Sequence, residues 1–276
     1  MDCDPLVPEY CMLPFPNNFW FDGHNLAIGN TTFPIAIDGG CIDPNAGGWN
    51  DLEGFSPFSP ITTYFKGMDD ASIESCPRLW NMEISLDDSS PTVLIDTVTG
   101  ESVAHWVEVD HVSDKSDVSN KRAMLIWPAT RLESSRRYIV GIRYLPNAVT
   151  GLPLQRSSAF DALATGTETT DPRVESRRSL YEDDIFPTLA VHHYPKQQLL
   201  LAWDFTTNSR DSIVSRMISA RDDARMRLEE TNGPEYEILE TQLNYNEYIY
   251  ARLDGVFKMP MYLNSPASQG SQACVE

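Results

Sequence analysis

The chain has 276 residues, 41% hydrophobic and 22% charged, and its 40 acidic and 21 basic side chains give a formal net charge of -19. This composition excludes wholesale disorder, and the length suffices for a sizeable core in one large domain or two small ones. The acidity argues against a nucleic-acid partner, because basic residues do not cluster beyond Arg136-Arg137 and Arg177-Arg178. We explain the excess of acidic residues by solubility in a salty extracellular medium, and the alternative is that some of the carboxylates form calcium sites.

Residues 1–56 are predicted to form an irregular segment that wraps over a core. They are rich in Pro, Gly, Asn and Asp, show little periodicity and contain an aromatic cluster at 15–21. We expect these rings to pack against the core, with sugar binding as the alternative, and Cys11 and Cys41 to hold the segment. Asn30 starts a glycosylation sequon, which is relevant only in a eukaryotic secretory pathway.

Residues 57–154 have the pattern of an Ig-like β-sandwich. Short apolar runs alternate with turn residues, and the connections vary in length, which favours a sandwich over a barrel. Gly100 suits a hairpin turn over 97–101. The segment 129–145 has the character of the last strand of such a sandwich. The predicted strands are 61–65, 79–86, 91–96, 102–110, 123–127 and 137–145.

Residues 155–263 are predicted to form a helix-strand-helix-strand extension packed on the sandwich, which makes the fold class mainly β with helical additions (α+β). The order is a helix-compatible stretch at 173–193, a buried strand at 199–205, a long helix at about 210–229 capped from 207–209, and strands within 236–263. Residues 264–276 are rich in Ser and Gln, which is typical of a linker, here to a downstream domain.

Five cysteines occur without any C-x-x-C spacing, which argues against zinc ribbons and thioredoxin-like sites. We expect two disulfides among Cys3, Cys11, Cys41 and Cys76 in a secreted or extracellular protein, leaving Cys274 to pair elsewhere. An intracellular protein with five thiols is the alternative. No apolar run approaches the ~20 residues of a membrane span, and residues 1–5 lack the features of a signal peptide.

The densest group of candidate ligands is the segment 105–111, H-W-V-E-V-D-H. On a strand, His105 and His111 would share one face and stand roughly 20 Å apart, too far for one zinc ion. Glu108 and Asp110 would share the other face about 7 Å apart, which makes them calcium candidates, with an exposed acidic pair as the alternative. No other cofactor is predicted.

Other polar pairs have structural explanations. His192 and His193 fall where a helix should end and can interact with its terminal carbonyls. The pairs at 69–70, 87–88 and 183–184 are expected in solvated turns or helix starts, since none matches an EF-hand loop. The chain contains neither G-x-S-x-G nor a glycine-rich phosphate loop, so no catalytic residue is predicted.

Several segments in a fixed order carry a family resemblance: 4–18 (with L-P-F-P-N-N), 52–61 (with E-G-F-S-P), 91–96, 105–110, 126–138, and 202–206 (A-W-D-F-T) followed by 221–224. Together they resemble the amino-terminal region of bacterial virulence-factor lipases and their large secreted relatives. The resemblance implies an extracellular β-rich domain that precedes an α/β-hydrolase-like domain, whose nucleophile, acid and histidine would lie beyond Glu276. The cysteines and the acidity depart from the lipases, which puts a lipid substrate in doubt.

Two function classes follow. The first is a non-catalytic accessory domain of a secreted lipase- or esterase-like hydrolase, whose partner is the downstream domain of the same polypeptide. The second is an extracellular glycan- or protein-binding (adhesion) module. An exposed apolar patch at the carboxyl-terminal face would favour the first, and an exposed aromatic row the second. An independent metal-dependent enzyme would need its histidines to converge in space.

The strand at 199–205 is expected to anchor the fold. We expect Trp203 and Phe205 to be buried between the sandwich and the long helix. Asp204 is expected to accept backbone hydrogen bonds at the junction.

Overall fold

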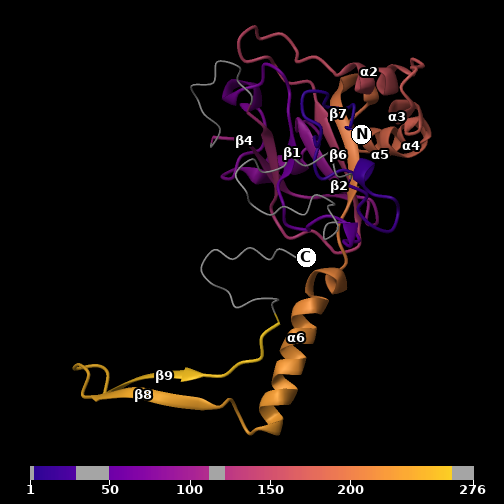
Figure 1. Ribbon diagram of the computed structural model, residues 1–276. Coiled ribbons are helices and arrows are strands. Elements are labelled where there is room, and N and C mark those ends of the chain that lie inside the picture. The colour runs from indigo at the N-terminus through magenta and orange to yellow at the C-terminus, as the bar shows by residue number, and fades with distance from the viewer. Residues whose placement is uncertain (1–2, 29–49, 112–121, 263–276) are drawn as a thin grey trace. The chain divides into compact units, whose positions relative to one another are not determined.

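The computed structural model describes residues 3–28, 50–111 and 122–262. Those up to Ser209 form one compact unit, and those from Arg210 onward form a second (Figure 1). The boundary between these two units, after Ser209, is not one of the segment boundaries expected after residues 56, 154 and 263. The expected segment boundaries remain a prediction.

The first unit contains two antiparallel sheets. A three-stranded sheet has the order β1-β5-β4 and a four-stranded sheet the order β3-β2-β6-β7. The strands are β1 (Ile61–Thr63), β2 (Thr92–Asp96), β3 (Glu101–Ser102), β4 (His105–Val109), β5 (Met124–Pro128), β6 (Arg137–Arg143) and β7 (Leu199–Thr206). The α+β class is therefore confirmed.

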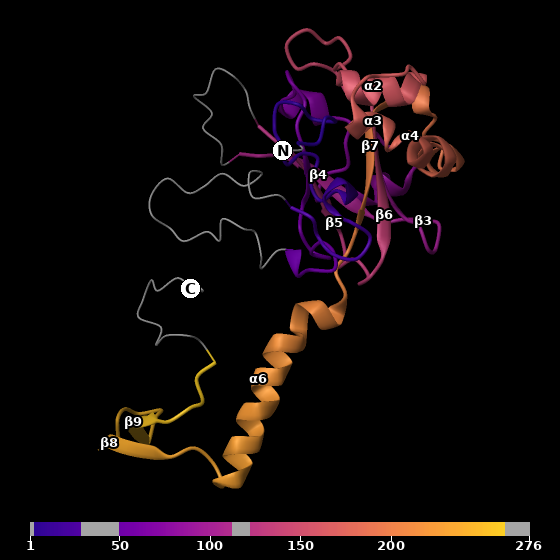
Figure 2. The same ribbon diagram turned by 45° about the vertical axis from the view of Figure 1, so that its right-hand side comes forward.

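Both sheets contribute side chains to one hydrophobic core. β4 and β5 alternate between buried and half-buried residues, as expected when one face of a sheet is covered. β2 is buried throughout and β7 almost throughout, because both faces of the four-stranded sheet are covered. Figure 2 shows helices on one side of β6 and β7 and the three-stranded sheet on the other.

The helical cover lies between β6 and β7 in the chain. It comprises α2 (Ser158–Thr165), α3 (Pro172–Glu175), α4 (Arg178–Leu180), a π-helical turn η4 (Tyr181–Ile185) and α5 (Phe186–Val191). Ser157 and Asp171 cap α2 and α3 by accepting backbone N–H groups. Leu189 packs so closely on the backbone of β6 that a Cβ on Gly141 would approach it to 2.7 Å. The helical stretch expected at 173–193 is confirmed.

Short 3₁₀ turns complete the first unit: η1 (Asn18–Trp20), η2 (Asp70–Ile73), η3 (Met82–Leu86) and η5 (Lys196–Gln198). The strand expected at 79–86 is wrong. Asn81 Oδ1 accepts the backbone N–H of Arg78, and this local bond favours a turn over a strand. Leu79 and Leu86 stay exposed there, 53% and 51%, instead of alternating into a sheet.

Two further expectations need correction. The strand expected at 102–110 is divided between the two sheets, β3 and β4, because the chain crosses from one sheet to the other at Val103 and Ala104. The strand β6 is not a last strand, since it lies between β2 and β7. The hairpin turn is confirmed, with Gly100 at φ 69°.

The second unit consists of the helix α6 (Arg210–Glu230) and a hairpin of β8 (Tyr236–Leu243) and β9 (Ala251–Phe257). The expected helix and strands are thus confirmed. None of the residues 210–262 is buried. Within the described part of the chain, no helix combines the length and apolarity needed to cross a bilayer.

Candidate functional site

The main buried polar cluster joins the N-terminal segment to the helical cover and to β7. We call it the polar network; it comprises Asp4, Asn17, Asn18, Arg137, Arg177, Asp184 and Asp204. Asp4, Asn17 and Asp204 are 0–2% exposed. Because buried charges are costly unless they are paired, the partners of each carboxylate decide what this cluster can do.

Asp4 is held by three donors. Its carboxylate accepts from Arg177 Nη1 at 3.0 Å, from Asn17 Nδ2 at 2.5 Å and from the backbone N–H of Leu6 at 2.9 Å. Desolvation raises the pKa of Asp4, and the positive charge of Arg177 opposes the rise. The carboxylate is fully occupied by internal partners, so its role is to fix the N-terminal segment.

Asp204 accepts from side chains rather than from the backbone as expected. Its Oδ2 accepts from Asn18 Nδ2 at 2.8 Å and from Arg137 Nε at 2.6 Å. Arg137 also donates to Asp184 of the π-helical turn at 2.5 Å. Packing brings these two side-chain donors to Asp204 from η1 and β6, the strand on which Ile139 lies opposite it.

Trp203 and Phe205 are both 0% exposed. Phe205 stacks on Tyr138 with ring centroids 5.6 Å apart. The π-helical turn is tied to the same strand, since the Tyr181 hydroxyl donates to the carbonyl of Ala202 at 2.8 Å. The segments 4–18, 126–138 and 202–206, which carry the family resemblance, therefore meet in the core of one unit.

The histidines lie in separate surroundings. His105 is fully buried, its Nε2 lies 2.8 Å from Thr92 Oγ1 and its Nδ1 2.9 Å from the Val103 carbonyl. Burial lowers the pKa of His105 to about 4. His111 lies 3.4 Å from Asp70, and His193 lies 3.4 Å from Asp88. α5 ends just before His192 as expected, but backbone N–H groups of 192–194 close its last turn, while His192 Nδ1 lies 3.4 Å from Ser102 Oγ.

Glu108 and Asp110 lie on and just after β4, on the half-buried side. Within residues 3–28, 50–111 and 122–262, no three His, Cys, Asp or Glu side chains gather closely enough to hold a metal ion. The calcium site at Glu108 and Asp110 stays a prediction. Among the other acidic pairs, Asp69 caps η2 with Ser72, and both Asp69 and Asp70 pair with Arg122.

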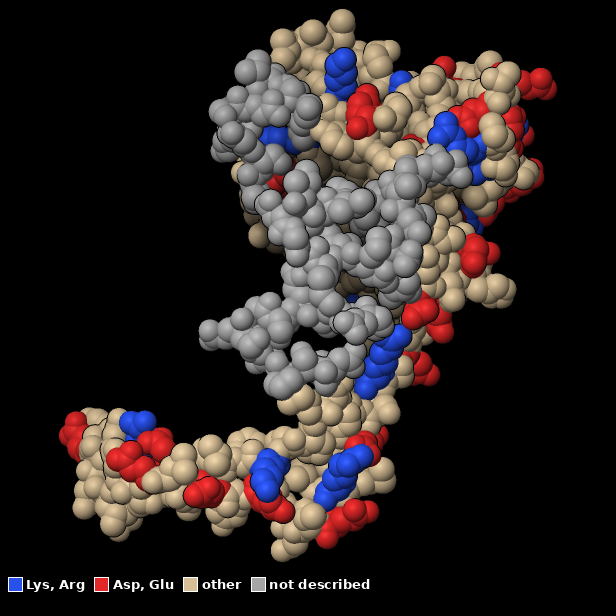
Figure 3. Space-filling model, viewed as in Figure 1, with Lys and Arg blue, Asp and Glu red and all other residues tan. Residues whose placement is uncertain are grey.

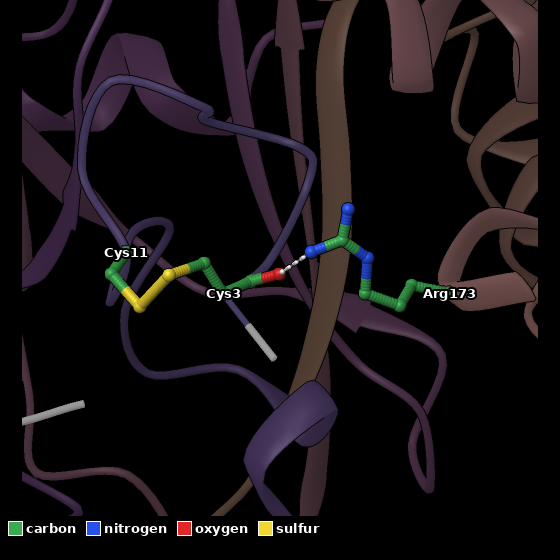
Figure 4. The surroundings of a disulfide bond; sticks show 3 residues. All are labelled: Cys3, Cys11 and Arg173. Carbon is green, nitrogen blue, oxygen red and sulfur yellow. Dashed lines mark hydrogen bonds between the residues drawn. A yellow bond between two sulfur atoms is a disulfide. The ribbon is translucent and has the colours of Figure 1, made fainter. Parts of the chain in front are cut away.

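One disulfide lies in the described residues, between Cys3 and Cys11 (Figure 4). Arg173 donates to the Cys3 carbonyl at 3.1 Å, which ties the disulfide loop to α3. This bond joins two of the four cysteines expected to form disulfides, and it gives Cys11 the expected role of holding the N-terminal segment. Cys76 is a buried free thiol, and its burial raises its pKa to about 12. Asn30, Cys41 and Cys274 lie outside the described residues.

A cavity of about 550 Å³ opens in the first unit beside the loop that follows β6. Its ionisable lining groups include Glu9, Lys66 and Arg156. Arg156 is engaged, because it donates to the carbonyls of Leu199 and Lys196 at 2.7 Å. Ser157 also lines the cavity and is engaged as well, because its hydroxyl oxygen accepts the backbone N–H of Phe160 as a helix cap. The residues that line the cavity include no histidine.

The second unit carries a surface that sequence reasoning missed. In the hairpin register, Tyr236 faces Phe257, Ile238 faces Gly255, Thr241 faces Leu253 and Leu243 faces Ala251. Because side chains alternate along a strand, these eight residues share one face, which we call the apolar hairpin face. Glu237, Glu240, Gln242, Arg252, Asp254 and Val256 share the other.

The apolar hairpin face is exposed to solvent. Its large side chains are 50–73% exposed: Tyr236, Ile238, Leu243, Leu253 and Phe257. Figure 3 shows acidic and basic side chains spaced along this unit with uncharged surface between them. The signal was present as a period-2 alternation in the sequence of both strands.

Comparison with protein-family models and with curated proteins gives no match for the chain.

Proposed function

We propose that the chain is a non-catalytic accessory domain of a secreted ester hydrolase, to which it supplies a folded support. The observation that carries this proposal is the polar network. Two of its three carboxylates, Asp4 and Asp204, lie in segments on which the resemblance to the lipase-related proteins rests, and they accept hydrogen bonds from Arg177 and Arg137. Groups paired in this way hold segments of the fold together.

The same proposal includes an Ig-like sandwich as the core of the first unit. Two antiparallel sheets that share one hydrophobic core support it. Secretion is supported by the Cys3–Cys11 disulfide, since such bonds persist in oxidising compartments.

Exposed apolar side chains in the carboxyl-terminal part of the chain support an accessory role, because apolar surface of this kind marks protein interaction sites. Glycan binding through the N-terminal aromatics has less support. Trp20 is 3% exposed, and Phe15, Phe19 and Phe21 are half-buried against the core.

The test is ester hydrolysis by this chain and by the natural polypeptide continued past Glu276, with short- and long-chain esters. We expect activity in the extended form alone, with none in the 276-residue chain. Hydrolysis by the chain itself would contradict the proposal. Inactivity of both forms would also contradict it and would favour the binding module.

A further inference from the structure

The hairpin of the second unit is a sheet with one face uncovered. A two-stranded hairpin is marginally stable in water unless its apolar face packs against another layer. None of the residues 210–262 is buried, so the described contacts do not provide such a layer. The five large side chains of the apolar hairpin face expose on the order of 600 Å². This is close to the ~800 Å² that each partner contributes to a stable protein interface.

The shape of the apolar hairpin face allows it to pack against an identical face. Along β9 the side chains alternate between small and large, in the order Ala251, Leu253, Gly255, Phe257. On β8, Leu243 lies opposite Ala251, Thr241 opposite Leu253 and Ile238 opposite Gly255, so a larger side chain faces a smaller one in these three pairs. The fourth pair, Tyr236 and Phe257 at the end of the hairpin, is large on both strands. An identical face turned by a twofold rotation can place its large side chains over the small ones.

Gly255 is required for the alternation of small and large side chains along β9. β8 has a bulge between Ile238 and Glu240 at this point, so Leu239 is an extra residue. A Cβ on Gly255 would lie 2.5 Å from the Glu237 carbonyl oxygen. The hollow at Gly255 is therefore fixed by the close approach of the two backbones.

The distribution of charge on the hairpin also favours an identical face as the partner. No ionisable side chain with a charge at neutral pH lies among the eight residues of the apolar hairpin face, whereas the opposite face carries Glu237, Glu240 and Asp254. Two copies can therefore meet without bringing these carboxylates into the interface. An anionic lipid surface is a poor partner for a chain with a net charge of -19.

We propose that the apolar hairpin face binds the same face of a second copy of this chain. Two hairpins then form a two-layer interface of four strands, with the layers ~10 Å apart. The charged faces point outward to water. The inference concerns oligomeric state and does not depend on the hydrolase partner.

The test is light scattering with size-exclusion chromatography on the full chain over a concentration series. We expect the wild type to reach twice the 31.1 kDa mass of the chain. Leu253→Asp should give the single-chain mass at every concentration. Val256→Asp is the matched control: Val256 lies on the same strand, faces the other side and is 53% exposed against 58% for Leu253. This variant should remain a dimer.

Circular dichroism and hydrogen exchange of 199–206 check that the variants keep the first unit folded. A wild type that stays at the single-chain mass would overturn the proposal, as would a dimer that survives Leu253→Asp. Loss of the dimer in both variants would also overturn it, because the effect would not depend on the face. Binding of a single chain to neutral phosphatidylcholine vesicles, abolished by Leu253→Asp, would identify a lipid surface as the partner instead.

Discussion

The indole Nε1 of Trp203 donates a hydrogen bond of 2.7 Å to the carbonyl oxygen of Pro16. The bond connects the centre of β7 to the N-terminal segment, 187 positions earlier in the chain. It is buried, and the indole fills the space between them with 0% exposure. The N-terminal segment is therefore part of the core of the first unit.

Trp203→Ala should lower the free energy of unfolding by about 3–5 kcal/mol, because it removes a buried aromatic side chain and leaves a cavity. Urea unfolding measures the loss. Trp80→Ala is the control, since Trp80 is 82% exposed, and it should change stability by less than about 0.5 kcal/mol. A loss below about 1 kcal/mol for Trp203→Ala would contradict the placement of this side chain.

Asp4→Asn should destabilise the protein by about 3–5 kcal/mol, because Arg177 would be left buried without its carboxylate. The side chain of Arg177 is 11% exposed and that of Asp4 is 0% exposed. The matched control is Asp161→Asn, which breaks the 3.3 Å pair of the 56% exposed Asp161 with Arg156 and should cost less than about 1 kcal/mol. Equal losses for the two variants would show that the buried pair has no special role.

His105 should make stability fall with acidification. Its folded-state pKa of about 4 lies below the ordinary value of 6.5, so the unfolded chain binds the proton more tightly. The contribution is complete above pH 6.5 and is lost as the pH falls from there towards 4. Between pH 7 and pH 5 the loss is about 2 kcal/mol.

The glutamine variant isolates this contribution. His105→Gln keeps a neutral polar side chain at both pH values, so its unfolding free energy should fall by about 2 kcal/mol less than that of the wild type over the same interval. The exposed His24 provides the control, and His24→Gln should leave the wild-type difference between pH 7 and pH 5 unchanged. Identical pH dependence in His105→Gln and the wild type would refute the assignment.

Replacing both cysteines of the disulfide, Cys3→Ser with Cys11→Ser, should cost about 2–3 kcal/mol from loop closure. The sequence separation of 8 residues makes the loop short, which keeps this value near the low end for disulfides. Thermal unfolding with and without a dithiol reductant measures it. In the folded wild type, peptide mapping after alkylation at pH 8 should find Cys76 unmodified; its modification would contradict the burial of this thiol.

The local features of the fold were predictable from the sequence. The run Leu199–Phe205 is continuously apolar apart from Asp204, which is typical of a strand covered on both faces. Gly100 identifies a hairpin turn by its chemistry alone. The partners of Asp204 and Cys11 were not predictable, because Arg137, Asn18 and Cys3 reach them through packing that no local pattern encodes. η3 was missed because its turns are closed by backbone bonds, such as that from the N–H of Ile84 to the carbonyl of Asn81, within a stretch whose apolar residues resemble those of a strand.

The distances in sequence between the partners of the polar network set an order of assembly. The bonds of Asp4 to Arg177, Asn18 to Asp204 and Trp203 to Pro16 span 173, 186 and 187 residues. At a translation rate of ~5–20 residues per second, residues 4–18 leave the ribosome roughly 10 to 40 seconds before β7 does. Throughout that interval Asp4 and Asn18 are hydrated and unpaired with their final partners. Completion of the core of the first unit thus begins only after β7 has been synthesised.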